Sequence, residues 1–305
     1  MSLHFTDVTL RDGLQMVSQV VAVEKKLALF DKLVACGFSR IEITSFVNPQ
    51  KVPQFADSEA FCQALFARGK SPVELMAFVP NARGMERLLA FPIDWSACFV
   101  SVSESFNAKN VNATVDQSLA QVESVVASAK KVGRKVRAYI STVFGCPYEG
   151  AIGDETLKYV FEKVAAAGPD EISLGDTIGV ATPKQVNHVL DLLAQEYPLA
   201  QTALHLHNTY GLAVAAALAG YQRGIRRFDG ATGGIGGCPY AKGASGNAAS
   251  EDLLYAFWRQ GQVGDFRTQA FTSVLETLQG LGLESQGRLS EVWKKGGNWY
   301  TGGKA

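Results

Sequence analysis

Two histidines at alternate positions are the first sign of chemistry in this chain of 305 residues. The chain has four histidines, and His205 and His207 both lie in the stretch ALHLHNTYG at 203–211. Alternate residues of a strand face the same side, so both imidazoles could reach one metal ion. The simpler interpretation is a pair of core histidines bonded to neighbouring carbonyls. Taken alone, the pair favours that interpretation by roughly two to one, because metal sites are rare.

Oxygen donors at other predicted strand ends change this balance. Asp12 follows the first predicted strand, and Asn247 follows the last. Two imidazoles with a carboxylate and an amide oxygen suit an octahedral divalent ion such as Mg²⁺ or Mn²⁺, with positions left for water. Zinc is less favoured, because no thiolate lies near the histidines in the sequence. The predicted metal ligands are therefore Asp12, His205, His207 and Asn247.

The tetrapeptide LRDG at 10–13 has two interpretations. It could be an ordinary exit from a strand, in which Asp12 bonds its own backbone and Gly13 takes a positive φ. By itself the tetrapeptide favours that interpretation. The functional interpretation places Asp12 on the metal and Arg11 beside it, as a cation for a developing oxyanion.

Other strand ends carry candidate acids, bases and nucleophiles. Glu42 ends the second predicted strand and Asp176 the sixth, where it is equally a turn residue or a base. Cys238 lies in GGIGGCPYAKGASGN at 233–247, a Gly-rich segment that could close over a substrate. The thiol is either an acid, base or nucleophile or a residue packed in a turn. The segment lacks the spacing of a nucleotide fingerprint, and Pro239 interrupts it.

The elements that carry these residues alternate between short β-rich runs and amphipathic helical stretches. About eight such units predict a single α/β domain of the (β/α)8 TIM-barrel type, with a doubly wound open sheet as the alternative. We expect the barrel over 1–262 and a helical segment with a Gly-rich tail over 263–305. The predicted strands are 5–10, 40–46, 73–79, 96–102, 135–143, 170–177, 202–209 and 226–234, and the predicted helices are 25–37, 57–69, 82–91, 114–132, 155–168, 183–197, 213–224 and 266–282.

Composition excludes several other classes of protein. Lys+Arg and Asp+Glu are equal at 29 each, so no basic field attracts nucleic acid. No apolar run is long enough to span a membrane, and the N-terminus lacks the features of a signal peptide. The five cysteines are scattered, which is typical of reduced thiols inside a cell. We therefore expect a cytoplasmic protein with no nucleic-acid or membrane partner.

Several motifs together closely resemble the 3-hydroxy-3-methylglutaryl-CoA lyase family. The resemblance runs from the first strand to about residue 260, and its last segment is the most specific. The wider superfamily, which includes isopropylmalate and homocitrate synthases, shares mainly the Arg-Asp and His-x-His elements. The motifs are LRDGLQ at 10–15, IEITSFVNPQKVPQFAD at 41–57, GCPYEG at 145–150, EISLGDTIGVATP at 171–183, HLHNTYG at 205–211 and GGIGGCPYAKGASGNAASEDLLY at 233–255.

The resemblance implies a divalent-metal-dependent barrel that cleaves a 3-hydroxy-3-methylglutaryl thioester, or a related 3-hydroxy-3-alkylglutaryl-CoA, to acetyl-CoA and acetoacetate or another 3-oxo acid. Such an activity belongs to leucine degradation, and the resemblance also implies a homo-oligomer, with a dimer as one possibility. It implies the same four metal ligands, Arg11 beside the enolate, Cys238 in proton transfer and Gln15 in cofactor binding. Asp176 or His205 could accept the proton of the substrate hydroxyl. Glu42 and Asp176 match the family's supporting acidic residues.

Two rival functions remain at the level of sequence. One is a Claisen-type synthase that joins acetyl-CoA to a 2-oxo acid, and VTLRDG at 8–13 is similar to those enzymes. The other is a barrel that only binds a CoA thioester. The chain departs from the lyase family at Met16, Val17 and Ser18, where the family usually has Asn-Glu-Lys. The family's contacts to CoA are therefore not all carried over.

Overall fold

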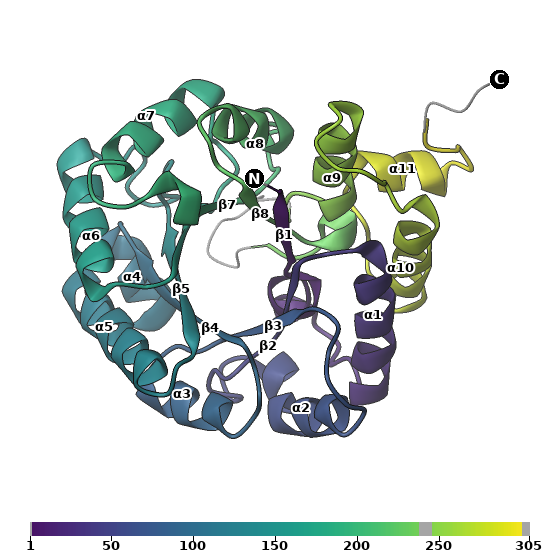
Figure 1. Cartoon of the computed structure of the whole chain (residues 1–305), viewed down its shortest axis with the longest axis horizontal. Coiled ribbons are helices and arrows are strands. Elements are labelled where there is room, and N and C mark those ends of the chain that lie inside the picture. The colour runs from purple at the N-terminus through teal and green to yellow at the C-terminus, as the bar shows by residue number, and fades with distance from the viewer. Residues whose placement is uncertain (1, 238–245, 301–305) are drawn as a thin grey trace.

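Eight parallel strands close into a barrel in the computed structural model, which describes residues 2–237 and 246–300. Each strand pairs with the next, and β8 pairs with β1, so the sheet has no edge. The predicted (β/α)8 barrel is confirmed, and the open-sheet alternative is wrong (Figure 1). The strands are β1 His4–Asp7, β2 Arg40–Ser45, β3 Glu74–Phe78, β4 Trp95–Ser101, β5 Lys135–Ser141, β6 Glu171–Asp176, β7 Thr202–Leu206 and β8 Arg227–Gly230.

Helices form a ring around the barrel and bury its outer face. Two of them begin with reciprocal capping boxes, Thr114 with Gln117 and Thr182 with Gln185, which satisfy the first free N–H groups. The helices are α1 Val23–Cys36, α2 Ser58–Phe66, α3 Ala82–Leu89, α4 Glu104–Val111, α5 Val115–Lys131, α6 Asp154–Ala167, α7 Pro183–Leu193, α8 Ala213–Gln222, α9 Ser250–Arg259, α10 Thr268–Gly280 and α11 Arg288–Lys294.

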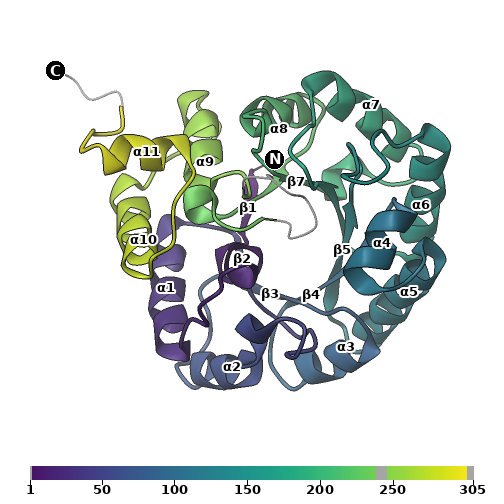
Figure 2. The same cartoon turned by 180° about the vertical axis from the view of Figure 1, so that it is seen from behind.

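The C-terminal helices lie outside the ring, beside α1 and α9 (Figure 2). The ammonium of Lys32 on α1 donates to Ser273 O at 3.1 Å and to Thr277 Oγ1 at 2.6 Å, which fastens α10 to the barrel. The predicted helix at 266–282 is found as α10, whereas α4, α9 and α11 were not expected. The division of the chain at residue 262 stays a prediction. Within the described residues, none of the helices is long and apolar enough to cross a membrane.

The first strand is shorter than predicted, and the reason is a buried carboxylate. The chain leaves β1 after Asp7 and enters a π-helix, Thr9–Gly13. Asp7 Oδ1 accepts the Thr9 N–H at 3.0 Å, and Asp7 Oδ2 accepts the hydroxyls of Thr232 and Ser250, both at 3.0 Å. This carboxylate turns the backbone out of the sheet and ties it to the chain that follows β8. Short π-helices of this kind are often found at functional sites.

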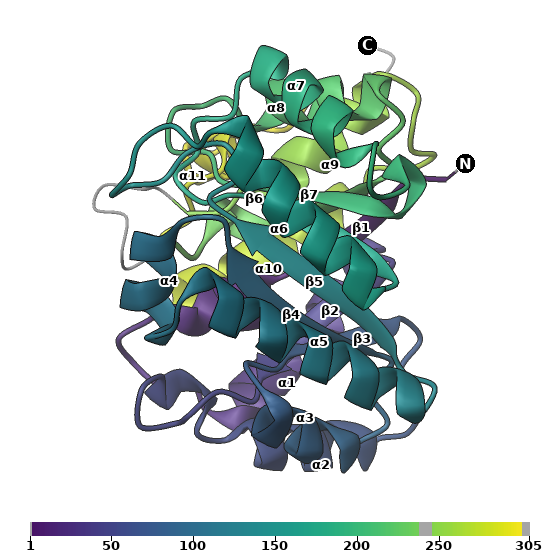
Figure 3. The same cartoon turned by 90° about the vertical axis from the view of Figure 1, so that its left-hand side faces the viewer.

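The loops that follow the strands lie at one end of the barrel. Figure 3 shows α4, which follows β4, at the end opposite the chain's N-terminus. In barrels of this type the chemistry takes place at that end. The π-helix after β1 and the segments after β7 and β8 therefore meet where a site is expected.

Glu251, in the first turn of α9, is fully buried at the same seam between β1 and β8. Its Oε2 atom accepts the Gly233 N–H at 3.0 Å, and its Oε1 atom has no hydrogen-bond partner among the described residues. Burial, with the nearby charge of Asp252, raises the pKa of Glu251 to about 8. Between pH 4.5 and about 8, Glu251 therefore keeps a proton in the folded protein that it has released in the unfolded chain.

We predict that Glu251→Gln is stabilising at high pH. Between pH 4.5 and about 8, this raised pKa lowers the free energy of unfolding as pH rises. The amide of Gln stays neutral at both pH values and removes that loss. The Tm difference between variant and wild type should therefore be at least about 2 °C larger at pH 8.5 than at pH 5.5, which corresponds to ~1 kcal/mol of unfolding free energy. Calorimetry of both proteins, with the surface variant Glu284→Gln as control, measures it. A difference in Tm that does not change with pH contradicts the prediction.

Candidate active site

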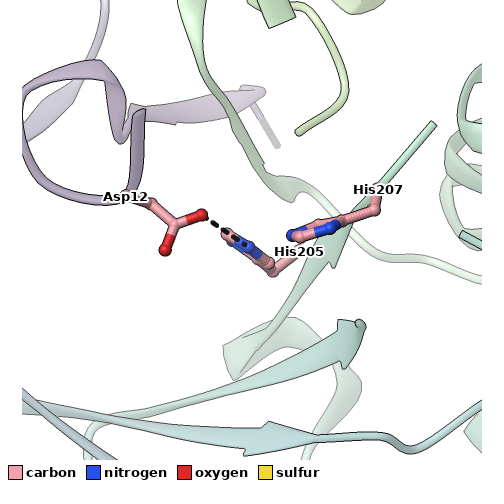
Figure 4. Close-up of side chains that lie close together, drawn as sticks. All are labelled: Asp12, His205 and His207. Atoms are coloured by element: carbon pink, nitrogen blue, oxygen red, sulfur yellow. Dashed lines mark ion pairs between the residues drawn. The ribbon is translucent and has the colours of Figure 1, made fainter. Parts of the chain in front are cut away.

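Asp12, His205 and His207 lie together at the carboxyl end of the barrel. One ligand atom from each lies within 4.8 Å of the other two. Figure 4 shows the three side chains close together. His205 Nε2 is 3.9 Å from Asp12 Oδ2. Asp12 comes from the π-helix after β1, His205 from β7, and His207 from the residue just beyond the end of β7. The structure thus brings these three predicted ligands to one point.

Asn247 completes the group from the segment before α9. Residue 247 forms a β-bridge with His207, and its Nδ2 donates to Asp12 Oδ2 at 2.8 Å and to Ile235 O at 3.1 Å. These donations fix the amide so that Oδ1 is free to act as an acceptor. Gly236 (φ +98°) must be glycine here, because a Cβ would lie 2.7 Å from Asn247 Nδ2.

Two buried polar atoms in this group have no hydrogen-bond partner in the described part of the chain: His207 Nδ1 and Asn247 Oδ1. An unpaired buried acceptor costs about 1–3 kcal/mol, so native proteins rarely leave one without a purpose. Together with the Asp12 carboxylate and His205 Nε2, these atoms are imidazole, amide and carboxylate donors. That donor set fits a divalent cation such as Mg²⁺ or Mn²⁺.

The protonation states agree with this fit. Burial, helped by the charges of His205 and Arg11, lowers the pKa of His207 to about 4, so its imidazole is neutral at pH 7 and has a free lone pair. Burial alone would raise the pKa of Asp12, but the Arg11 guanidinium and the two histidines lower it below its usual value. Asp12 and His207 therefore present a carboxylate and a neutral imidazole nitrogen, the forms that bind metal.

Arg11 is fixed beside the cluster by two carboxylates. Its Nε donates to Glu42 Oε2 at 2.6 Å, and its Nη1 donates to Asp12 Oδ1 at 2.5 Å. Tyr139 also donates to Glu42 Oε2, at 3.3 Å. Burial alone would lower the pKa of Arg11, yet the charges of Glu42 and Asp12 raise it well above its ordinary value. The guanidinium is therefore a permanent, oriented cation at the site.

A cavity of about 710 Å³ opens onto this cluster. Of the predicted site residues, Arg11, Asp12, Gln15, His205 and His207 line it, whereas Glu42 and Asn247 support the lining from behind. The rest of the wall is largely apolar, and one exposed lysine contributes to it. This additional lining includes Met16, Val47, Lys51, Phe78, Phe99 and Val111.

Asp176 does not belong to this cluster. Its neighbours Gly175 and Thr177 line the cavity, but Asp176 faces the opposite way, because successive residues of a strand alternate in direction. Its carboxylate accepts the N–H groups of Val180 at 3.0 Å and Ala181 at 2.9 Å. Of the two interpretations left open by the sequence, the geometry favours the turn residue, and the role of Asp176 as a base stays a prediction.

The alternative for LRDG as a simple strand exit does not fit the structure. The side chain of Asp12 contacts Arg11 and Asn247, and Gly13 is not among the glycines with positive φ. Cys238 lies outside the described residues, so its predicted role is not addressed by the geometry.

Asp229 and Tyr139 also contact the site, and no motif of the sequence indicates them. Asp229 Oδ2 lies 3.2 Å from His205 Nδ1, and Tyr139 lies edge-on to the His205 ring with centroids 5.7 Å apart. Both residues come from the middle of predicted strands, where other polar residues surround them and no spacing distinguishes them. Asp229 lies in RRFDG at 226–230 and Tyr139 in KVRAYISTV at 135–143.

Comparison with known proteins agrees with the fold and identifies the family. A family model described as HMGL-like matches residues 2–278. Hydroxymethylglutaryl-CoA lyase YngG of Bacillus subtilis is 44% identical over 245 residues, which are 80% of this chain and 81% of that protein. The 3-hydroxy-3-isohexenylglutaryl-CoA/hydroxy-methylglutaryl-CoA lyase of Pseudomonas aeruginosa is 40% identical over 253 residues, with 83% and 84% covered.

Solved structures give the same result. The hydroxymethylglutaryl-CoA lyase from Pseudomonas aeruginosa aligns with a TM-score of 0.89 at 36% identity, over 97% of this chain and 98% of that one. An HMG-CoA lyase from Acinetobacter baumannii in complex with coenzyme A and 3-methylmalate aligns with a TM-score of 0.89 at 32% identity, over 100% of this chain and 97% of that one.

The fold and the matched relatives define the class: an α/β-barrel enzyme that acts as a carbon–carbon lyase. Within that class, the chain belongs to the HMGL-like family, which confirms the resemblance found in its motifs. The roles of the individual site residues remain to be tested.

We predict that His207→Ala loses affinity for Mn²⁺ by at least ~100-fold, because one of the converging donor atoms is removed. Isothermal titration calorimetry on the metal-free protein measures the affinity. The matched control is His188→Ala, which removes an exposed histidine that pairs with Asp154 at 2.8 Å. Unchanged Mn²⁺ binding in His207→Ala would remove this residue from the ligand set.

Proposed function

We propose that the protein is a divalent-metal-dependent lyase that cleaves 3-hydroxy-3-methylglutaryl-CoA, or a related 3-hydroxy-3-alkylglutaryl-CoA, to acetyl-CoA and a 3-oxo acid. The observation that carries this proposal is the convergence of Asp12, His205 and His207 beside the fixed cation Arg11, in one cavity. The names of the two relatives described above, both hydroxymethylglutaryl-CoA lyases, support the same reaction.

The reaction breaks the bond between C2 and C3 of the acyl group. The proton of the tertiary hydroxyl leaves, C3 becomes a carbonyl, and the bonding electrons move to C2 and the thioester oxygen as an enolate. A proton added at C2 then gives acetyl-CoA. A bound Mg²⁺ or Mn²⁺ would supply Lewis-acid stabilisation of the hydroxyl oxygen, and Asp12, His205, His207 and Asn247 would hold it.

Arg11 is placed to stabilise the enolate. Glu42 and Asp12 hold its guanidinium from two sides, so the group is oriented before the substrate binds. Its delocalised charge faces the cavity, where the thioester oxygen becomes negative. A preorganised donor of this kind is typically worth about 3–4 kcal/mol of the barrier. Tyr139, by its bond to Glu42, adds a second constraint on the same carboxylate.

The two predicted roles of His205 compete for one atom. Its Nδ1 is already bonded to Asp229, so only Nε2 is open toward Asp12. That nitrogen cannot hold a metal ion and accept the hydroxyl proton in the same step. We propose metal ligation for His205 Nε2, because Asp12 and His207 direct donor atoms to the same point. The proton-transfer role proposed for Cys238 does not compete with it.

Acyl-CoA binding is supported by the shape and lining of the cavity. Its apolar wall, from Val47, Phe78 and Phe99, suits an alkyl substituent on C3 of the substrate. Coenzyme A also carries a diphosphate and a 3′-phosphate. We propose that Lys51, an exposed lysine in the lining, contacts one of these phosphates, and that Gln15 contributes a polar contact.

The direct test is an assay of product formation. With 3-hydroxy-3-methylglutaryl-CoA and Mg²⁺ or Mn²⁺, we expect acetoacetate and acetyl-CoA, and we expect EDTA to abolish both products until metal is added back. Incubating acetyl-CoA with 2-oxo acids in a parallel reaction distinguishes the synthase alternative. If no acetoacetate forms with either metal, 3-hydroxy-3-methylglutaryl-CoA is not the substrate.

We predict that Lys51→Gln raises the KM for the CoA thioester by roughly 3- to 10-fold and leaves kcat unchanged, since a phosphate contact far from the reacting bond contributes equally to ground and transition states. The corresponding pantetheine thioester, which lacks the diphosphate and the nucleotide, should show the same KM with both proteins. The matched control is Lys25→Gln, which replaces an exposed lysine on α1. An equal rise in KM for both substrates would contradict the phosphate contact.

The cytoplasmic location, the homo-oligomeric state and the role of the C-terminal segment remain predictions. The length of the alkyl chain on C3 is part of the same proposal, and the assay above extends to longer homologues directly.

A further inference from the structure

A buried network of charges fills the barrel beneath the site. Arg137, on β5, is 1% exposed and reaches across the barrel interior to three other strands. Its Nη1 donates to both Asp229 oxygens on β8 at 2.7 Å, its Nε donates to Glu171 on β6 at 2.5 Å, and its Nη2 donates to Thr6 on β1 at 3.1 Å. Such a network is costly to bury, so its position directly below a functional cluster needs an explanation.

Asp229 is the member of this network that touches the site. Its Oδ2 atom lies 3.2 Å from His205 Nδ1 and also accepts the Ser173 hydroxyl at 3.2 Å. Both carboxylate oxygens are held by Arg137, so the carboxylate cannot rotate away from the imidazole. An ionised carboxylate can only accept hydrogen bonds. The His205 nitrogen that faces it must therefore carry a proton.

This contact determines which His205 nitrogen is free. With the proton on Nδ1, the lone pair is on Nε2, the nitrogen that faces Asp12 at 3.9 Å. The opposite tautomer would direct an N–H group into the predicted metal site. Ligating histidines usually bond their second nitrogen to a carboxylate or carbonyl, which orients the ring and increases its basicity.

We propose that Asp229, itself held by Arg137, is a positioning residue that fixes the tautomer and ring orientation of His205 for metal binding. This inference rests on the proposed ligand set, and it adds a residue from the barrel interior that the sequence patterns did not indicate. It explains why the strands here carry a charged network where a barrel of this type normally has layers of apolar side chains.

The test compares Asp229→Asn with Glu171→Gln. Both substitutions remove one of the two buried carboxylates that flank Arg137, and both keep the shape of the side chain, but only Asp229 contacts His205. The Asn amide can direct an N–H toward His205 and favour the wrong tautomer. We expect Mn²⁺ affinity, measured by calorimetry on the metal-free proteins, to fall about 10- to 100-fold in Asp229→Asn and to stay within about 3-fold of wild type in Glu171→Gln.

A second measurement needs no variant. Long-range ¹H–¹⁵N NMR of the metal-free wild type, labelled at its four histidines, reports which nitrogen of His205 carries the proton. We expect the Nδ1–H tautomer. An Nε2–H tautomer in the wild type, or equal losses of Mn²⁺ affinity in the two variants, overturns the proposal. A wild type that fails to bind Mn²⁺ refutes the metal site itself, while the tautomer still tests the contact with Asp229.

Discussion

Closure of the barrel by β1 and β8 is the constraint on which the site depends. The strands pair from His4 opposite Arg227 to Asp7 opposite Gly230, which brings the first and last parts of the barrel side by side. Asp7 strengthens this seam through hydroxyls that follow β8. Only then can Asp12, from the π-helix after β1, accept a hydrogen bond from Asn247, more than 200 residues later in the chain. A sheet left open at this seam would separate two of the proposed ligands.

The buried charges of the barrel interior add little to the stability of the fold, but they fix the positions of side chains at the site. Apolar side chains of similar volume are often as stabilising as a buried ion pair, because desolvation offsets most of the Coulomb attraction. Here burial alone would raise the pKa of Asp229, yet Arg137 lowers it to about 2, so the charge persists in the interior. The network instead fixes orientation. The guanidinium of Arg137 holds the Asp229 carboxylate, and the carboxylate holds the His205 imidazole.

The sequence predicted the parts of this structure that follow a period or a short spacing. The alternation of strands and helices gave the barrel, and the spacing of His205 and His207 gave two donors on one side. Asp229, Tyr139 and Arg137 could not be found this way, because each bonds to residues on other strands that no spacing along the chain relates to it. The π-helix after β1 was not predicted for a related reason. It follows Asp7, whose carboxylate bonds to hydroxyls more than 200 residues away in the sequence. Asp176 shows why a polar residue at a strand end leaves two interpretations open, since its carboxylate bonds N–H groups of its own loop.

The balance of charge at the cluster connects the proposed metal with the proposed substrate. Arg11 remains protonated, and its carboxylate partners Asp12 and Glu42 leave the group with one excess negative charge when both are ionised. A substrate that brings its own carboxylate, and then develops an enolate, would be repelled by that charge. A divalent cation held by Asp12 and the two histidines would add two positive charges and reverse the sign to one net positive charge. A cation at these ligand atoms would therefore add to the attraction that Arg11 exerts on the acid end of the substrate and on the enolate. The orientation of His205, which would help to hold that cation, thus matters for more than one step.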